Sequence, residues 1–232
     1  MVAPSPARDD RPPRPGTPPS LHRAGAAVAY SPTVMTRSTS AAFDAAAAAV
    51  TAMRTRAEIA VRASPGPTRL APCALVLNAT VTVRDVQVAD ARLVILHDPA
   101  GQETWHGQWR MVLFASAELE ASMIDDPVVT QMGWQWLEEA LGERDLAVTA
   151  FGGTVTRTAA QSFGTLDENP PTGDLEIRAS WTPVVNAPHP DLRSATPAAI
   201  IREHVAAWLD LLELITGLEP AVEGIARLDT RR

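Results

Sequence analysis

Arg157 is the residue of this sequence whose position points most directly to a chemical role. Residues 154–159 alternate in the manner of a β-strand, with threonines on one face and Val155, Arg157 and Ala159 on the other. Arg157 is therefore expected to point inward among apolar neighbours. Because a guanidinium removed from water needs an anion beside it, we expect a negatively charged group next to Arg157.

Two kinds of anion meet that requirement. In the first arrangement, a protein carboxylate such as Glu118 forms a structural ion pair with Arg157. In the second, Arg157 binds the carboxylate or phosphate of a small anionic ligand, together with Arg110 or Arg178 as a second arginine in the middle of a strand. The ion pair is the favoured interpretation, because the sequence does not place a second arginine next to Arg157.

Tryptophan is the other unusual feature, with six tryptophans against one tyrosine. Trp105 lies in an expected hairpin, and Trp134 and Trp136 lie in an expected helix. Residues two apart on a helix are separated by about 200° of rotation, so Trp134 and Trp136 cannot both contact the same neighbour. One is expected to pack on a sheet, which leaves the other to line a groove or contact a partner. Core packing is the more common role, although aromatic residues also favour interfaces.

Nucleophilic and metal chemistry find little support. No Gly-x-Ser-x-Gly elbow is present, and Cys73 follows Pro72 without an adjacent basic residue, which is typical of a small buried apolar side chain. Of the five histidines, only His97 and His106 could converge on a metal ion, with Asp98 as a neighbouring carboxylate ligand. Their spacing matches no metal-binding motif, so we predict no metal site. We expect both histidines to lie in the turn or at the exposed edge of the hairpin.

Acid–base and phosphate chemistry have simpler alternatives. Glu118 and Glu120 share a strand face and precede Asp125 and Asp126, but Asp126 is expected to cap a helix and the others to form a solvated face. Gly152-Gly153 lacks the following helix that a phosphate loop needs. It is expected to be a glycine bulge in one bent strand, with a two-residue hairpin turn as the alternative.

Composition sets wider limits. The chain has 232 residues, of which 46% are hydrophobic and 20% charged, as in ordinary globular proteins. All 20 basic residues are arginine, which excludes every reaction that needs a lysine amine. We therefore expect no cofactor that is attached to a lysine. No segment has the roughly 18 apolar residues of a membrane helix. One cysteine and the lack of a long apolar leader indicate a cytoplasmic setting.

The chain divides into three parts. Residues 1–40 hold eight prolines, five arginines and two aspartates, and we predict a disordered tail of charge +3. Residues 41–217 are expected to form a single domain, and 218–232 a C-terminal tail. Since the whole chain carries −7, the part after residue 40 carries −10, which argues against nucleic acid as a partner.

Two helices are marked by residues at their ends. Ser40 is a typical cap for an alanine-rich helix over 41–54. Asp126 and Pro127 predict the cap and first turn of a second helix, and Gly142 predicts its end. These signals lie at opposite ends of the intervening strand-rich region.

A third helix has the clearest pattern. It begins at Thr196 and Pro197 and ends at Gly217. Its apolar residues repeat at intervals of four and three, which predicts one buried stripe, formed by Ile201, Val205, Trp208, Leu212 and Ile215.

The region between these helices alternates with the period of strands. The residues at 98–101 predict a hairpin turn, and the uninterrupted apolar run at 93–96 predicts a central strand covered on both faces. The fold class is therefore α+β, with a mainly antiparallel sheet of about six strands and two to three packed helices. The expected strands are 75–83, 92–97, 109–117, 146–151, 154–158 and 175–181.

Four stretches together resemble a known family. They read LVILHDPAGQETWHGQWRMVLFASAELE, DDPVVTQMGWQWLEEAL, GGTVTRTAAQSFG and LEIRASWTP. Their pattern is similar to the actinobacterial family known as domain of unknown function 3000, over roughly residues 41–217. The resemblance implies an actinobacterial cytoplasmic protein and implies no activity and no catalytic residues.

These observations favour a non-catalytic domain that binds a protein partner, or a second copy of itself, through tryptophans near the hairpin and the second helix. The alternative is a binder of, or an enzyme acting on, a small anionic metabolite held by Arg157 with Arg110 or Arg178. RNA binding through the arginine-bearing tail is a weaker third hypothesis.

Overall fold

The computed structural model describes residues 40–67, 69–185 and 196–219. All of them belong to one compact unit, Arg37–Arg232. Almost all of the tails expected at 1–40 and 218–232 lies outside the described residues.

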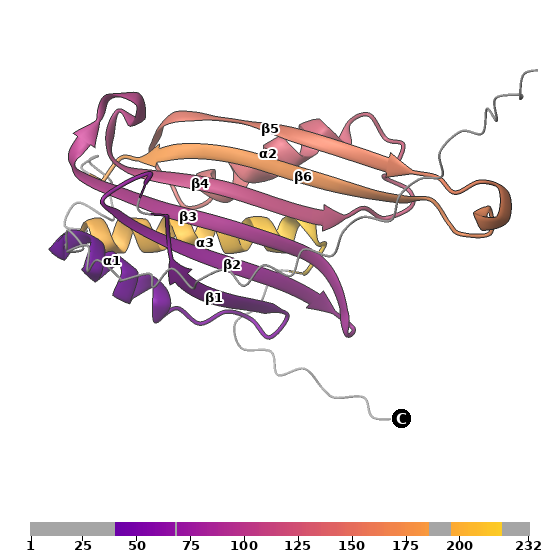
Figure 1. The fold of residues 1–232 in the computed structure, drawn as a ribbon, viewed down its shortest axis with the longest axis horizontal. Coiled ribbons are helices and arrows are strands. Elements are labelled where there is room, and N and C mark those ends of the chain that lie inside the picture. Colours follow the sequence, from indigo (N-terminus) through magenta and orange to yellow (C-terminus); the bar gives the residue numbers. More distant parts are fainter. Residues whose placement is uncertain (1–39, 68, 186–195, 220–232) are drawn as a thin grey trace, which may run out of the picture. The chain divides into compact units, whose positions relative to one another are not determined.

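A single antiparallel sheet forms the centre of the domain (Figure 1). Its strands run in the order β1-β2-β3-β4-β6-β5, and every neighbouring pair is antiparallel. With three helices on it, this sheet confirms the predicted α+β class. The strands are β1 (Ile59–Pro65), β2 (Cys73–Val83), β3 (Val86–Gln102), β4 (Gly107–Glu118), β5 (Val148–Ala160) and β6 (Thr172–Pro183).

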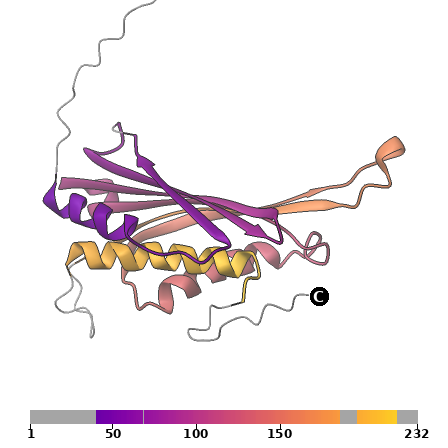
Figure 2. The same ribbon diagram turned by 90° about the horizontal axis from the view of Figure 1, so that it is seen from below.

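The three helices lie together on one face of this sheet (Figure 2). They are α1 (Ala41–Thr51), α2 (Val129–Gly142) and α3 (Pro197–Ile215). The caps predicted for two of them are present, because Ser40 accepts from the Phe43 amide and Thr196 accepts from the Ala199 amide. Gly217 follows α3 with a positive φ of 63°, a conformation that glycine adopts without strain.

The predicted start of α2 is wrong by two residues. Asp126 does not cap the helix; its carboxylate accepts from the Val128 amide at 2.9 Å within a turn, and Val128 occupies the cap position without a side-chain hydrogen bond. The local Asp126–Val128 bond holds this segment in a turn, so regular helix begins only at Val129.

The predicted hairpin turn at 98–101 is also wrong. Strand β3 continues through this segment to Gln102, and the chain reverses at the 3₁₀ turn Glu103–Trp105. Asp98 explains the mistaken signal, because its carboxylate accepts from the Ala100 amide at 3.0 Å and from the Gln102 side chain at 3.2 Å. These local bonds interrupt the register between β3 and β4 without reversing the chain.

The glycine pair lies in one bent strand, as preferred from the sequence, but the bulge itself is at Ala150 and Phe151, directly before the glycines. The β5–β6 register shifts between Thr149 and Gly152, and β5 continues as one strand on both sides. A Cβ atom on Gly153 would clash with the carbonyl oxygen of Arg178, whereas one on Gly152 would meet nothing within 4 Å. Gly153 is therefore required by the close approach of β6.

The core lies between the helices and the sheet. The apolar run at 93–96 is central, since β3 is the third of six strands, but the described helices cover only one of its faces. Leu93 and Ile95 point into the core, while on the opposite face Val94 is half-buried and Leu96 is 3% exposed, so the predicted cover on both faces holds at Leu96. Trp208 of the predicted α3 stripe is 1% exposed, which confirms that the stripe packs inward.

Candidate functional site

Arg157 does not form the predicted structural ion pair, with Glu118 or with another described carboxylate. Its position opposite Leu175, a core residue, places it on the helix-covered face, as the alternation indicates. There its guanidinium donates to the carbonyl oxygen of Ile124 at 2.7 Å, and no ion pair to it occurs among the described residues. Arg157 thus fastens the segment before α2 to strand β5.

Arg110 and Arg178 lie on the opposite face of the sheet from Arg157. Arg110 donates to the carbonyl of Ala150 at 2.8 Å and to the hydroxyls of Ser180 and Thr182 at 2.6 and 3.3 Å. Partial burial lowers the pKa of its guanidinium. All of its described partners are uncharged.

Arg178 is exposed, and its charge is matched locally. It forms an ion pair with Glu176 at 2.6 Å, which raises the pKa of its guanidinium, and it lies over the Phe114 ring at 5.5 Å. The sheet therefore separates Arg157 from both other arginines. The metabolite site predicted from Arg157 with Arg110 or Arg178 is not formed, because register places them on different faces.

Two of the three candidate tryptophans have structural contacts. Trp105 lies in the turn before β4, where its carbonyl accepts from the Thr182 hydroxyl at 2.6 Å. Trp134 stacks on Phe151 of β5, with ring centroids 4.7 Å apart, and its indole donates to Glu138 at 2.9 Å. The side chain of Trp134 therefore anchors α2 to β5, whereas the contact of half-buried Trp105 is made by its backbone carbonyl.

Trp136 has a different environment, as its spacing from Trp134 predicts. Together with Met132, one helical turn earlier, it lines a groove of about 670 Å³ at the end of the sheet where β4 finishes. We call this the Trp136 groove. Most of its wall is apolar and comes from β2, β3, the segment after β4, α2, the β5–β6 loop and α3: Val83, Val88, Leu119, Ala121, Met123, Met132, Trp136, Pro170, Pro171, Leu214 and Ile215.

Close packing of α2 on the sheet positions this groove. Gly133 allows the approach, because a Cβ there would lie only 3.1 Å from side-chain carbons of both Leu175 and Val155. With Gly133 buried against the sheet, Met132 and Trp136 lie together on a neighbouring side of the helix. Met132 could have been identified from the sequence, because it lies four residues before Trp136 and therefore on the same side of the helix.

The rim of the groove is acidic. Glu118 and Glu120 line it with exposed carboxylates, and a neighbouring hollow of about 340 Å³ shares Glu118 and adds Asp90 and Asp174. No arginine or histidine is among the described residues that line either space. The arrangement favours an apolar group with a positive charge beside it.

The remaining candidate side chains do not form a reactive cluster. Cys73 is buried, as expected, but His97 is only 3% exposed and packs on Trp109 at 4.1 Å, so its expected rim position is wrong. His106 is exposed at the turn. Within residues 40–67, 69–185 and 196–219, no group of three or more histidine, cysteine or acidic side chains could hold a metal ion.

Comparison with known proteins identifies the family without adding an activity. None of the described helices is long and apolar enough to cross a membrane. Neither a curated protein nor a solved structure matches this chain. The family model described as "Protein of unknown function (DUF3000)" matches residues 39–226, which is most of the chain, so the protein belongs to the DUF3000 family.

Proposed function

We propose that this protein is a non-catalytic cytoplasmic domain that binds a partner protein in the Trp136 groove. The observation that carries the proposal is the groove itself, whose volume of about 670 Å³ lies in the range of ligand-binding clefts and whose wall is mainly apolar. Tryptophan is among the residues that contribute most to binding energy at protein interfaces.

The chemistry of the wall indicates the kind of partner segment. Met123 and Met132 have flexible, polarizable side chains, which adapt to apolar groups of different shapes. Glu118 and Glu120 at the rim would attract arginine or lysine. We therefore propose that the groove binds a segment with apolar side chains next to basic ones.

This proposal narrows the surface expected from the sequence. Trp105 and the groove lie at opposite ends of the 12-residue strand β4. Trp105 precedes its first residue, whereas Glu118, its last residue, lines the groove. Trp134 packs on Phe151. Trp136 is therefore the tryptophan proposed to contact the partner, while Trp105 and Trp134 are proposed to support the fold.

Site-specific photo-cross-linking in native host cells tests the proposal. A photoreactive amino acid replaces Met132 in the groove or, as a control, Thr156 on the exposed face of β5. We expect one defined cross-linked protein from position 132 and none of that mass from position 156. Sequencing the cross-linked peptide would show whether it combines apolar and basic residues, and whether it comes from another protein or from a second copy of this chain.

Two variants connect the cross-link to the groove. Trp136→Ala should abolish it, whereas Trp134→Ala, on the same helix but outside the groove, should retain it as long as both variants keep the wild-type circular dichroism spectrum. Equal cross-linking from positions 132 and 156, or no loss with Trp136→Ala, would refute a partner in this groove.

A further inference from the structure

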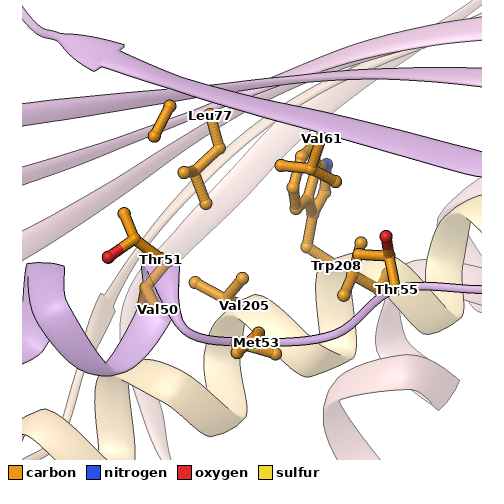
Figure 3. A pocket seen from close by; sticks show the side chains of 10 residues that line it. Val50, Thr51, Met53, Thr55, Val61, Leu77, Val205 and Trp208 are labelled. Atoms are coloured by element: carbon orange, nitrogen blue, oxygen red, sulfur yellow. The ribbon is translucent and has the colours of Figure 1, made fainter.

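The two faces of the sheet differ in how they are covered. On the helix side, core side chains such as Leu77, Val205 and Trp208 line a small cavity of about 120 Å³ between α1, β1, β2 and α3 (Figure 3). The described helices leave most of the opposite face open (Figure 2). We call this opposite face the outer face, and it displays every second residue of each strand.

A row of basic, polar and aromatic side chains crosses the outer face. Five residues paired in register form this arginine row, one from each of five neighbouring strands: Arg62, Asn78, Arg92, Phe114 and Arg178. Arg178 already forms its ion pair with Glu176. Arg62 and Arg92 are exposed and have no ion pair among the described residues, and Arg92 donates to the uncharged side chain of Asn78 at 3.0 Å. The row therefore offers two guanidinium groups to an anionic partner.

Apolar side chains form the next row of the outer face. This valine row consists of Val76, Val94 and Val112, which are paired in register two residues beyond the arginine row, and Val112 is 37% exposed. On the other side of the arginine row lie Asp90 and Glu176. The middle of the outer face is thus complementary to a group that combines apolar and acidic side chains.

The loop between β5 and β6 carries this combination. Residues 159–173, which we call the arm, extend beyond the helices and bend toward the side of the outer face (Figures 1 and 2). At the tip, Phe163 is 75% exposed and Leu166 is 59% exposed, more than any other large hydrophobic residue that the structure describes, and the exposed acids Asp167 and Glu168 follow. The 3₁₀ turn Gly164–Leu166 fixes the shape of the tip. Clustered apolar exposure of this kind is typical of an interaction site.

We propose that two copies of this chain form a symmetric dimer in which the arm of each copy binds the outer face of the other. The two apolar side chains of the tip pack on the partner's valine row, and Asp167 and Glu168 pair with the partner's Arg62 and the partner's Arg92. Because a two-fold axis repeats the contact, one complementary pair of surfaces is used twice. This dimer does not depend on the Trp136 groove, since none of these residues lines it.

The charge pattern along the arm fits this arrangement. The only charged residues at 159–173 are Asp167 and Glu168, both at the tip. The uncharged stem therefore crosses the partner's two acidic residues beside the arginine row without repulsion, and the tip brings its carboxylates to the arginines. Nucleic acid fits this row less well, because the guanidinium of Arg178 lies over the Phe114 ring at 5.5 Å and occupies its stacking face.

Reversing the charges on one surface at a time tests the contact. One variant carries Arg62→Glu and Arg92→Glu on the outer face, and the other carries Asp167→Arg and Glu168→Arg on the arm. Sedimentation velocity should show a wild-type dimer and, for each variant alone, a dissociation constant raised at least about tenfold. An equimolar mixture of the two variants should dimerise like the wild type, because each arm then meets a face of opposite charge.

Phe163→Ser tests the apolar part of the contact. The side chain is exposed, so the substitution should keep the fold and weaken the dimer at least about tenfold. Val128→Ser is the matched control, since Val128 is also exposed, at 48%, but lies at the start of α2 on the helix-covered side. It should leave the dissociation constant unchanged. Circular dichroism checks the fold of each variant.

Trp136→Ala separates this dimer from binding in the Trp136 groove, and it should leave the dissociation constant unchanged. The proposal is overturned by a wild type that stays monomeric up to about 0.1 mM, by charge reversals or Phe163→Ser that do not weaken the dimer, or by a mixture of the two charge-reversal variants that remains monomeric. A dimer lost in Trp136→Ala would likewise overturn it, because that result would place the second copy in the groove.

Discussion

The indole N–H of Trp181 donates to Nδ1 of His204 at 3.2 Å, inside the core between β6 and α3. Because Nδ1 accepts, His204 is neutral and carries its proton on Nε2, which has no partner among the described residues. His204 is fully buried, and burial lowers its pKa to about 3.

This relationship predicts a loss of stability in mild acid. In the unfolded chain His204 takes up a proton below about pH 6.5, whereas in the folded protein it stays neutral until about pH 3. The stabilising contribution is complete above pH 6.5 and falls by up to about 1.4 kcal/mol per pH unit as the pH drops toward 3. Burial also lowers the pKa of His97, which acts in the same direction.

Urea unfolding at several pH values between 7.5 and 4.5 measures this effect. His204→Gln keeps an acceptor for Trp181 but cannot titrate, so its stability should fall less steeply with acid than that of the wild type. His106→Asn, at an exposed turn position with a positive φ, is the matched control and should follow the wild type. Parallel curves for His204→Gln and the wild type would contradict the prediction.

Trp208→Ala should lower the free energy of unfolding by about 3 to 5 kcal/mol, because it removes a side chain that is 1% exposed and enlarges an existing cavity. Chemical denaturation checks this value. Trp105→Ala, at a half-buried turn, should cost clearly less. An unchanged midpoint for Trp208→Ala would mean that the α3 stripe is not part of the core.

Arg157→Met should lower the free energy of unfolding by about 1 to 3 kcal/mol, because it removes one charge-assisted hydrogen bond to Ile124 and not a buried ion pair. Phosphate and sulfate should produce no saturable rise in the melting temperature of either protein. A saturable rise that disappears in Arg157→Met would restore the small-anion hypothesis.

Gly153→Ala and Gly152→Ala form a matched pair that tests the close approach of β6 to β5 beside the bulge. Only the first places a methyl group against the backbone of Arg178 and Ala179, and it should cost about 1 to 3 kcal/mol in thermal or chemical denaturation. The second points into open space and should change stability by a few tenths of a kcal/mol. Similar costs at both positions would contradict the close approach of β6 at Gly153.

Patterns confined to one element were predictable from the sequence. The caps of α1 and α3, the buried stripe around Trp208 and the bend of β5 at the glycines each depend on residues close together in the chain. Strand β1 was missed because its alternation is weak, with Ile59 as its only buried residue.

Relationships between elements were not predictable. The faces occupied by Arg157 and Arg178 depend on the register and the bulge of β5 against β6, which a single sequence does not determine. The apolar wall of the Trp136 groove comes from six separate segments. Trp136, Ile215 and the rim residues Glu118 and Glu120 were each singled out from the sequence, but nothing in the sequence brought them together. Glu118 and Glu120 lie next to an apolar wall only because the tertiary fold brings these segments together.

The most direct test of the central claim is the affinity of the partner segment identified by cross-linking from position 132. A synthetic peptide of that segment is titrated into wild-type protein, Trp136→Ala and Trp134→Ala by calorimetry. We predict a loss of at least tenfold in affinity for Trp136→Ala, with Trp134→Ala close to the wild type. Affinities for Trp136→Ala and the wild type that agree within twofold would contradict binding in the Trp136 groove.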